Sequence, residues 1–261
     1  MFIKSEAPAA ERNKNPILEV LKNVIKVPEN TNSFPSVKIL EISSGTGQHI
    51  THFAKHMNPQ IFWQPTEYDK RQFSSICAYI QHDNLKNVAP PVYVDIREDF
   101  TKWKPICNDP EKSVSTIEPI TTFNENDFDY IYNSNLIHIS SFDCTEGLFY
   151  NAGKLLKNGG WLITYGPYGQ NGKYKLNFIF FFNKSKVIEI FTLLLLLLIT
   201  GVLTPESNVQ FDRGLRMSDP SWGVRDIQQQ LIPLAEKNNL KLVNIFDMPS
   251  NNKLLLWNKR A

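Results

Sequence analysis

The chain has 261 residues, which is enough for one large domain with a sizeable buried core. Its formal net charge is only +2 and no dense basic block occurs, so the composition argues against a dedicated nucleic-acid binder. Three widely separated cysteines without a C-x-x-C pair, Cys77, Cys107 and Cys144, predict reduced thiols in an intracellular protein, cytoplasmic or nuclear. The same spacing predicts neither a disulfide framework nor a metal site. No signal peptide is expected, because the first residues lack a long apolar core.

Residues 5–26 are predicted to form a helix with Pro16 in its first turn. Apolar side chains then recur at helical spacing and predict a buried face made of Ile17, Leu18, Val20, Leu21, Val24 and Ile25. The polar stretch 9–14 ahead of this face allows two interpretations, a solvated arm or a lid over a cofactor pocket. In the second interpretation, Arg12 or Asn13 reaches a carboxylate of the cofactor.

A strand, a glycine turn and a helix follow one another between residues 37 and 57. The β-branched run 37–42 is typical of a buried parallel strand, and it stops at the small residues 43–47. The helix predicted after them carries its apolar face at Ile50, Phe53, Ala54 and Met57. This order of elements opens a doubly wound α/β domain, in which glycines let backbone N–H groups approach a ligand.

The acidic residue beside this turn indicates which kind of ligand the turn binds. The turn has G-x-G rather than the full G-x-G-x-x-G of dinucleotide-binding proteins. Glu41 lies just before it and would repel a diphosphate, so the turn better suits an amino-acid-like zwitterion. The pattern E-x-x-x-G-x-G after a first strand resembles motif I of the class I methyltransferases, which bind S-adenosylmethionine. The alternative is an ordinary strand-turn-helix of another α/β protein.

Two further predicted strands, 60–68 and 88–96, also end in carboxylates, and a helix over 70–82 lies between them. Glu67 can accept both hydroxyls of a ribose, with Asp69 as a competitor whose other interpretation is a helix N-cap. In a class I methyltransferase the position of Asp95 takes the adenine amino group, and the position of Ile96 packs on the ring. Ligands of such sheets bind outside the carboxyl ends of the strands, so Glu41, Glu67 and Asp95 together favour one site.

Residues 101–126 read as a long surface loop, and 128–133 as a fourth strand. The segment after it carries Asn135 and His138, but the N-P-P-Y signature of amino-methylating enzymes is absent. His138 is either a general base or a hydrogen-bonded core histidine. A helix over 145–157, stopped by Asn158-Gly159-Gly160, is followed by a fifth strand over 161–165.

Residues 173–201 have a composition found nowhere else in the chain. A membrane anchor is disfavoured, because charged residues interrupt the apolar run and residues 190–203 are too short to span about 30 Å. Residues 172–174 can be encoded by a splice donor, residues 199–201 by an acceptor, and the leucine-rich run between them by a pyrimidine tract. We interpret 173–201 as a translated intron and not as part of the native domain. The alternative is a buried or membrane-touching insertion.

The last part of the chain begins with a polar and aromatic mixture over 207–226, expected to be a functional loop or short helices. It contains Asp212, Arg216 and Arg225, to which the sequence assigns no roles. Asp226 is expected to cap a helix over 227–238, and two closing strands are predicted at 240–247 and 253–257.

The whole chain outside 173–201 resembles the methyltransferase-like 26 family. The resemblance rests on PAAERNKNPILEVL, LEISSGTGQHITHFA, WQPTEYD, NLIHISSFDCTEGLF, GGWLITYGPY, SNVQFDRGLR, DPSWGVRD and MPSNNKLL. It implies one α/β domain over 1–261 with a Rossmann-like, seven-stranded, mostly parallel sheet and a C-terminal antiparallel hairpin. It also implies S-adenosylmethionine as ligand, at Arg12, Glu41, Ser43, Gly45, Gly47, Glu67, Asp95 and Ile96.

On this interpretation Asn135, His138 and Tyr168 face the methyl acceptor. The resemblance does not identify the methyl acceptor. We expect this acceptor to be a small molecule or a protein. Two functions therefore stay open, an active methyltransferase and a non-catalytic module that binds S-adenosylmethionine or a partner.

Overall fold

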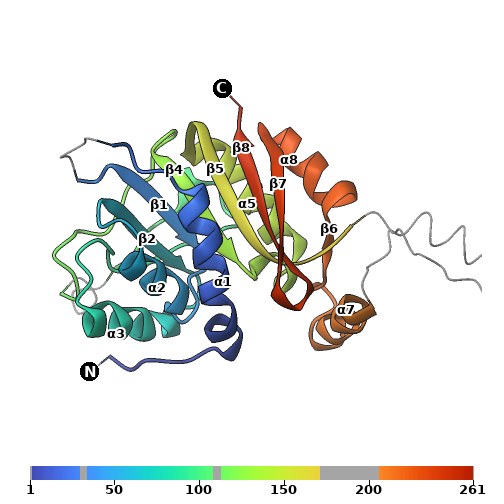
Figure 1. The fold of residues 1–261 in the computed structure, drawn as a ribbon, viewed down its shortest axis with the longest axis horizontal. Coiled ribbons are helices and arrows are strands. Elements are labelled where there is room, and N and C mark those ends of the chain that lie inside the picture. The colour runs from blue at the N-terminus through green and yellow to red at the C-terminus, as the bar shows by residue number, and fades with distance from the viewer. Residues whose placement is uncertain (1, 30–33, 108–112, 171–205, 261) are drawn as a thin grey trace, which may run out of the picture.

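A mostly parallel sheet forms the centre of the computed structural model, which describes residues 2–29, 34–107, 113–170 and 206–260 (Figure 1). The strands run in the order β3-β2-β1-β4-β5-β8-β7, and only β7 and β8 are antiparallel to their neighbours. Their bounds are β1 Val37–Ile42, β2 Ile61–Glu67, β3 Val92–Tyr93, β4 Phe128–Ser134, β5 Leu156–Gly169, β7 Leu240–Met248 and β8 Asn252–Lys259. A two-residue strand, β6 (Arg225–Asp226), pairs in parallel with Tyr168 and Gly169 at the carboxyl end of β5. The predicted seven-stranded sheet with a closing hairpin is confirmed, with β6 as an addition.

Helices cover both faces of the sheet (Figure 1). One face carries α1 (Pro8–Val24), α2 (Gln48–His56) and α3 (Phe73–Asp83), whose apolar side chains pack together in one core cluster. The other carries α5 (Phe142–Leu155) and α8 (Ile232–Lys237), which belong to a second cluster. The remaining helix, α7 (Glu206–Ser218), lies beside the turn between β7 and β8. In the described part of the chain, no helix has both the length and the apolar character needed to cross a membrane.

The register of the central strands brings the predicted site segments to one edge. Glu41 near the end of β1 is paired with Pro65 of β2 and with Tyr132 of β4. Because the three strands are parallel and end together, the turn after β1, Glu67 and the segment after β4 meet at the same edge. Every residue of β2 is buried, as expected for a strand with helices on both faces.

Several predicted elements differ from the structure. The fifth strand, predicted over 161–165, runs over Leu156–Gly169, so that Asn158-Gly159-Gly160 lie within it and do not stop the preceding helix. The third strand is only Val92–Tyr93, because Pro90 and Pro91 have no N–H to donate to a ladder. Helix α5 begins earlier and ends at Leu155, since Leu156 already pairs with β4. The mixed segment 207–226, predicted to be a functional loop or short helices, contains one regular helix, α7.

The predicted cap at Asp226 is confirmed. Its carboxylate accepts hydrogen bonds from the backbone N–H groups of Gln228 and Gln229. A short π-helix, Ile227–Leu231, follows the cap and leads directly into α8. Residues 173–201, interpreted above as a translated intron, lie outside the described residues.

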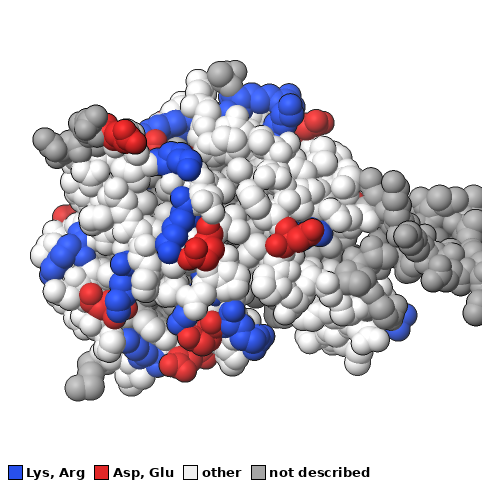
Figure 2. All heavy atoms as spheres, in the orientation of Figure 1, with Lys and Arg blue, Asp and Glu red and all other residues white. Residues whose placement is uncertain are grey.

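Lys and Arg are interspersed with Asp and Glu on the face drawn in Figure 2, with no large area of one sign among the described residues. Several Lys side chains of the chain form ion pairs, among them Lys22 with Glu19 and Lys38 with Asp127.

Candidate functional site

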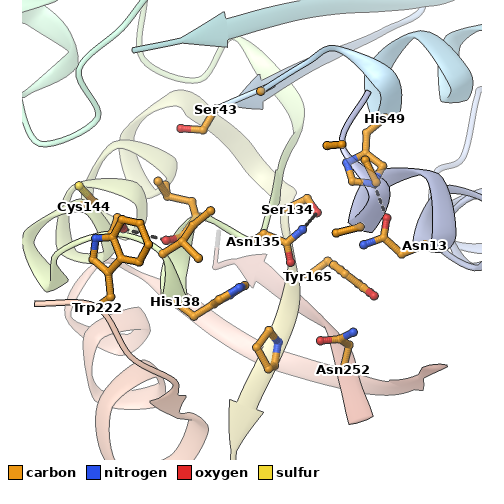
Figure 3. A pocket seen from close by; sticks show the side chains of 18 of the residues that line it. Asn13, Ser43, His49, Ser134, Asn135, His138, Cys144, Tyr165, Trp222 and Asn252 are labelled. Atoms are coloured by element: carbon orange, nitrogen blue, oxygen red, sulfur yellow. Dashed lines mark hydrogen bonds between the residues drawn. The ribbon is translucent and has the colours of Figure 1, made fainter. Parts of the chain in front are cut away.

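A cavity of about 1040 Å³ lies at the carboxyl edge of the sheet. Its walls come from far-apart segments of the chain, and Figure 3 shows their side chains turned toward a common space. We call the wall formed by lining residues of 43–46, 67–68 and 94–97 the glycine-turn side. We call the wall formed by lining residues of 134–144, 165–167, 207–222 and 249–252 the histidine side. Residues of α1 close the cavity as well.

The turn after β1 has the backbone that its small residues allow. Ser43, Gly45 and Gly47 all have positive φ angles, of 58°, 55° and 87°. A side chain at Gly47 would also lie 2.8 Å from Ile76 Cα, so glycine is required there for α3 to pack. The left-handed backbone of Ser43 costs about 1–2 kcal/mol and is held by its surroundings.

Glu67 joins this turn to the end of β2. The backbone N–H of Gly45 donates to Glu67 Oε2 at 2.7 Å, and the N–H of Asp69 donates to Oε1 at 2.9 Å. Burial raises the pKa of Glu67, and these backbone hydrogen bonds act against the rise. Asp69, its competitor, instead pairs with Arg71 and caps the short turn Lys70–Gln72, and it does not line the cavity.

Glu41 lies behind the turn and does not line the cavity, and neither does Gly47. Glu41 is only 1% exposed, and its Oε2 has no hydrogen-bond partner among the described residues. Burial raises the pKa of Glu41 to about 8, and the nearby Glu67 carboxylate acts in the same direction. A buried carboxyl group with one oxygen that lacks a partner favours an incoming cation.

Asp95 and Ile96 both line the cavity, but Asp95 is paired with an arginine that sequence reasoning missed. Arg97 Nε lies 2.9 Å from Asp95 Oδ1, and one terminal nitrogen lies 2.6 Å from Oδ2. These hydrogen bonds lower the pKa of Asp95. The guanidinium also lies over the ring of Tyr68, 5.4 Å from its centroid. The D-x-R spacing directly after the strand was the available signal.

The start of α1 forms part of the wall. Arg12 and Asn13 line the cavity, with Arg12 exposed and Asn13 half-buried. Asn13 Oδ1 lies 2.6 Å from Nε2 of His49, a second lining residue missed from the sequence. Burial lowers the pKa of His49 to about 4. Its place directly after the glycine turn was the available signal.

His138 is the central residue of the histidine side. It ends the short helix η3 (Leu136–His138) and is 5% exposed, and its Nδ1 has no partner among the described residues. Burial lowers the pKa of His138 to about 4, with the Arg225 guanidinium adding to the effect, so its imidazole is neutral at pH 7. A side chain at Gly166 would lie 3.1 Å from His138 Nδ1, so this glycine leaves room for the ring. Asn135 lines the cavity beside it and donates to Ser134 Oγ at 3.1 Å.

Tyr168 does not line the cavity, which corrects the expectation that it faces an acceptor. It is fully buried in the core cluster of α5 and α8. Tyr165 of the same strand lines the cavity instead. Because side chains alternate along a strand, residues three apart point to opposite faces. Two tyrosines so close in sequence could be assigned only after the register was known.

The sequence assigned no roles to Asp212, Arg216 and Arg225. In the structure these residues hold the segment that follows α7. Asp212 accepts hydrogen bonds from the Val224 N–H and from Arg216 Nε, both at 2.8 Å. A terminal nitrogen of Arg225 donates to the carbonyl oxygens of Ser140 and Ser221, at 3.1 and 2.8 Å.

The same segment contacts the histidine directly. The N–H of Gly223 donates to the carbonyl oxygen of His138 at 3.0 Å. Phe211 of α7 and Trp222 line the cavity, and the ring of Phe211 lies 5.7 Å from the imidazole. Sequence reasoning grouped these aromatic residues with a functional segment but did not assign them to a wall.

The strand order and the cavity beyond the carboxyl ends define a Rossmann-like fold of the class I methyltransferase type. Solved structures agree. An O-methyltransferase family protein from Burkholderia thailandensis is similar with a TM-score of 0.60 at 12% identity, over 97% of this chain and 58% of that one. A putative O-methyltransferase from Nostoc punctiforme gives 0.58 at 12% identity, over 99% and 63%. The YcgJ protein of Bacillus subtilis gives 0.56 at 10% identity, over 96% and 99%.

The chain thus spans little more than half the length of the Burkholderia protein and nearly all of YcgJ. At these identities the similarity shows the fold. The particular family follows from the sequence match. The family described as "Protein of unknown function (DUF938)" matches residues 4–184 and 197–259, and the chain belongs to it.

Proposed function

We propose that the protein is an S-adenosylmethionine-dependent methyltransferase, with the cofactor on the glycine-turn side and the acceptor on the histidine side. The observation that carries the proposal is the set of carboxyl groups of Glu41, Glu67 and Asp95 at three successive strand ends around a left-handed glycine turn. The methyltransferase-like fold and the resemblance to the methyltransferase-like 26 family support it.

The residues present fit this cofactor. The buried Glu41 carboxyl, with an oxygen that lacks a partner among the described residues, favours an ammonium group near the turn. Glu67 is held by two backbone N–H groups, and its remaining lone pairs suit ribose hydroxyls. Ile96 supplies a buried apolar surface for a purine ring, and Arg12 a positive charge for a carboxylate. S-adenosylmethionine, when bound, supplies an electrophilic methyl group on a sulfonium.

The chain's own contribution to such a transfer is positioning. An acceptor atom on the histidine side forms a bond to the methyl carbon as the carbon–sulfur bond breaks, and the sulfur keeps that electron pair. The acceptor then loses its proton. Asn135 and the neutral His138 can hydrogen-bond the acceptor and take this proton, while the walls exclude water.

A second function has one observation in its favour. A histidine with a pKa of about 4 is a weak general base, as expected for a module that binds S-adenosylmethionine without turnover. Incubation with labelled methyl donor and cell extracts separates the two functions. Transfer that is lost in His138→Ala and Asn135→Ala supports the enzyme.

Calorimetric binding of S-adenosylmethionine and S-adenosylhomocysteine tests the cofactor assignment. We expect saturable binding that weakens at least tenfold in Glu67→Ala, about 1.4 kcal/mol or more. Glu146→Ala is the matched control, because Glu146 is an exposed carboxylate on α5 that does not line the cavity. A folded wild-type protein that binds neither compound contradicts the proposal.

A further inference from the structure

The histidine side of the cavity is almost free of charge. Asp219 is the only Asp, Glu, Lys or Arg among its described lining residues. The Asp219 carboxylate is engaged by its own loop, where the N–H and the hydroxyl of Ser221 both donate to Oδ1. His138 is neutral at pH 7 because burial lowers its pKa, and burial also raises the pKa values of the Tyr165 hydroxyl and the Cys144 thiol. An anion placed here would lose hydration and gain no positive counter-charge from the described lining residues of this side, and a cation could pair only with the Asp219 carboxylate, which already accepts hydrogen bonds from Ser221.

Large apolar side chains are open on this side. Phe211 is 45% exposed and Ile139 is 43% exposed, and both line the cavity. Trp222 lines the same wall, and Figure 3 shows its indole among the side chains that face the cavity. Aromatic faces of this kind bind flat rings by offset stacking or edge contacts.

Polar groups of the same wall are neutral donors and acceptors. Asn135, His138 and Asn252 lie around one part of the cavity in Figure 3. Because the Phe211 ring lies 5.7 Å from the imidazole, a ring packed on Phe211 would place a substituent near the polar groups. Amides and a neutral imidazole suit a hydroxyl, which both donates and accepts.

We propose that the acceptor bound on the histidine side is an uncharged, flat small molecule that carries a hydroxyl group, with its ring against Phe211 and Trp222. This inference rests on the proposed function and names its substrate class. In the transfer, an oxygen lone pair forms the new carbon–oxygen bond while the carbon–sulfur electrons return to sulfur. The hydroxyl proton leaves to His138 or water, and the product is a neutral methyl ether.

Three phenols of matched size test the charge preference. Binding of 4-methylphenol, 4-hydroxybenzoate and tyramine is measured by calorimetry with the full chain saturated with S-adenosylhomocysteine. The neutral phenol should bind at least tenfold more tightly than the anion or the cation. Equal or tighter binding of either charged phenol overturns the proposal, and so does a failure of the neutral phenol to bind.

Two variants locate the ring. Phe211→Ala should weaken 4-methylphenol binding at least fivefold and leave S-adenosylhomocysteine affinity within twofold. Met217→Ala is the control on the same helix, because Met217 is 87% exposed and does not line the cavity. Unchanged phenol binding in Phe211→Ala overturns the assignment of the ring site. If S-adenosylhomocysteine fails to bind, the proposed function fails, and the same phenols measured on the free protein still test the charge preference.

Discussion

At the scale of single residues, two carboxyl groups close to one turn are stabilised differently. Glu67 accepts two backbone hydrogen bonds, whereas Glu41 is buried with an oxygen that has no partner among the described residues. The difference makes Glu41 the carboxyl group whose charge is most sensitive to a bound cation. It also ties the stability of the free protein to pH.

Glu41→Gln should flatten that pH dependence. The folded protein holds the Glu41 proton up to about pH 8, and the unfolded chain releases it near 4.5, so stability falls as pH rises between these values. Between pH 6 and pH 9 the wild type should lose about 2–3 kcal/mol more than Glu41→Gln. Urea denaturation of both proteins at the two pH values measures the difference. Parallel losses would show that Glu41 is ionised in the folded state.

Gly166→Ala should disturb His138. Its new methyl group would lie 3.1 Å from Nδ1, so the imidazole must shift by a few tenths of an ångström. We expect a loss of about 1–2 kcal/mol in unfolding free energy and a changed imidazole NMR signal, with S-adenosylhomocysteine binding retained. Gly214→Ala is the control, because it lies in α7 with open space around it and should raise stability by about 0.5–1 kcal/mol. An unchanged imidazole signal in Gly166→Ala would contradict this placement of His138.

At the scale of elements, α7 is held to the sheet by few contacts. Asn251 donates to Ser207 Oγ at its start, and Asp212 binds the segment after it. The part of the histidine side formed by α7 and the segment after it therefore depends on hydrogen bonds, and such segments open more readily than central strands.

Asp212→Ala should loosen this segment. It removes the acceptor of the Val224 N–H and the partner of Arg216, which should cost about 1–3 kcal/mol. Hydrogen exchange should rise in residues 206–225 and stay unchanged in β1 and β4. Arg213→Ala, an exposed position on the same helix, should change neither. Uniform exchange across the variant would mean that Asp212 supports the whole fold and not this segment.

The elements also show what the sequence could predict. The strands β1, β2 and β4 fall within one residue of their predicted bounds, because short runs rich in β-branched or aromatic residues and bounded by turn residues are typical of strands. The third strand was predicted too long, because the apolar pattern continues through Pro90 and Pro91, which cannot donate hydrogen bonds to a neighbouring strand. The segment of α7 was predicted only as a loop or short helices, because its mixture of polar and aromatic residues shows no clear helical periodicity. Tyr168 was misplaced because the face of a strand depends on its register.

At the scale of the whole molecule, the sheet is continuous across the gap between the described residues 170 and 206. Strand β5, which precedes the gap, pairs with β4 from the same part of the chain. It also pairs with β6 and β8, which follow the gap in the sequence. All of these hydrogen bonds join residues outside 173–201. The family match omits residues 185–196 of that segment and includes 173–184 and 197–201.

A chain that lacks residues 173–201 should therefore keep the fold and its ligand. We expect one cooperative unfolding transition, and S-adenosylhomocysteine at a hundredfold excess over its Kd should stabilise it by about 2.7 kcal/mol, as in the full chain. A chain in which a glycine-serine linker of equal length replaces 173–201 is the control for connection length. If the deletion abolishes cooperative unfolding and the linker restores it, the domain needs the length of this segment. If neither variant folds, residues 173–201 belong to the native domain, and the intron interpretation is wrong.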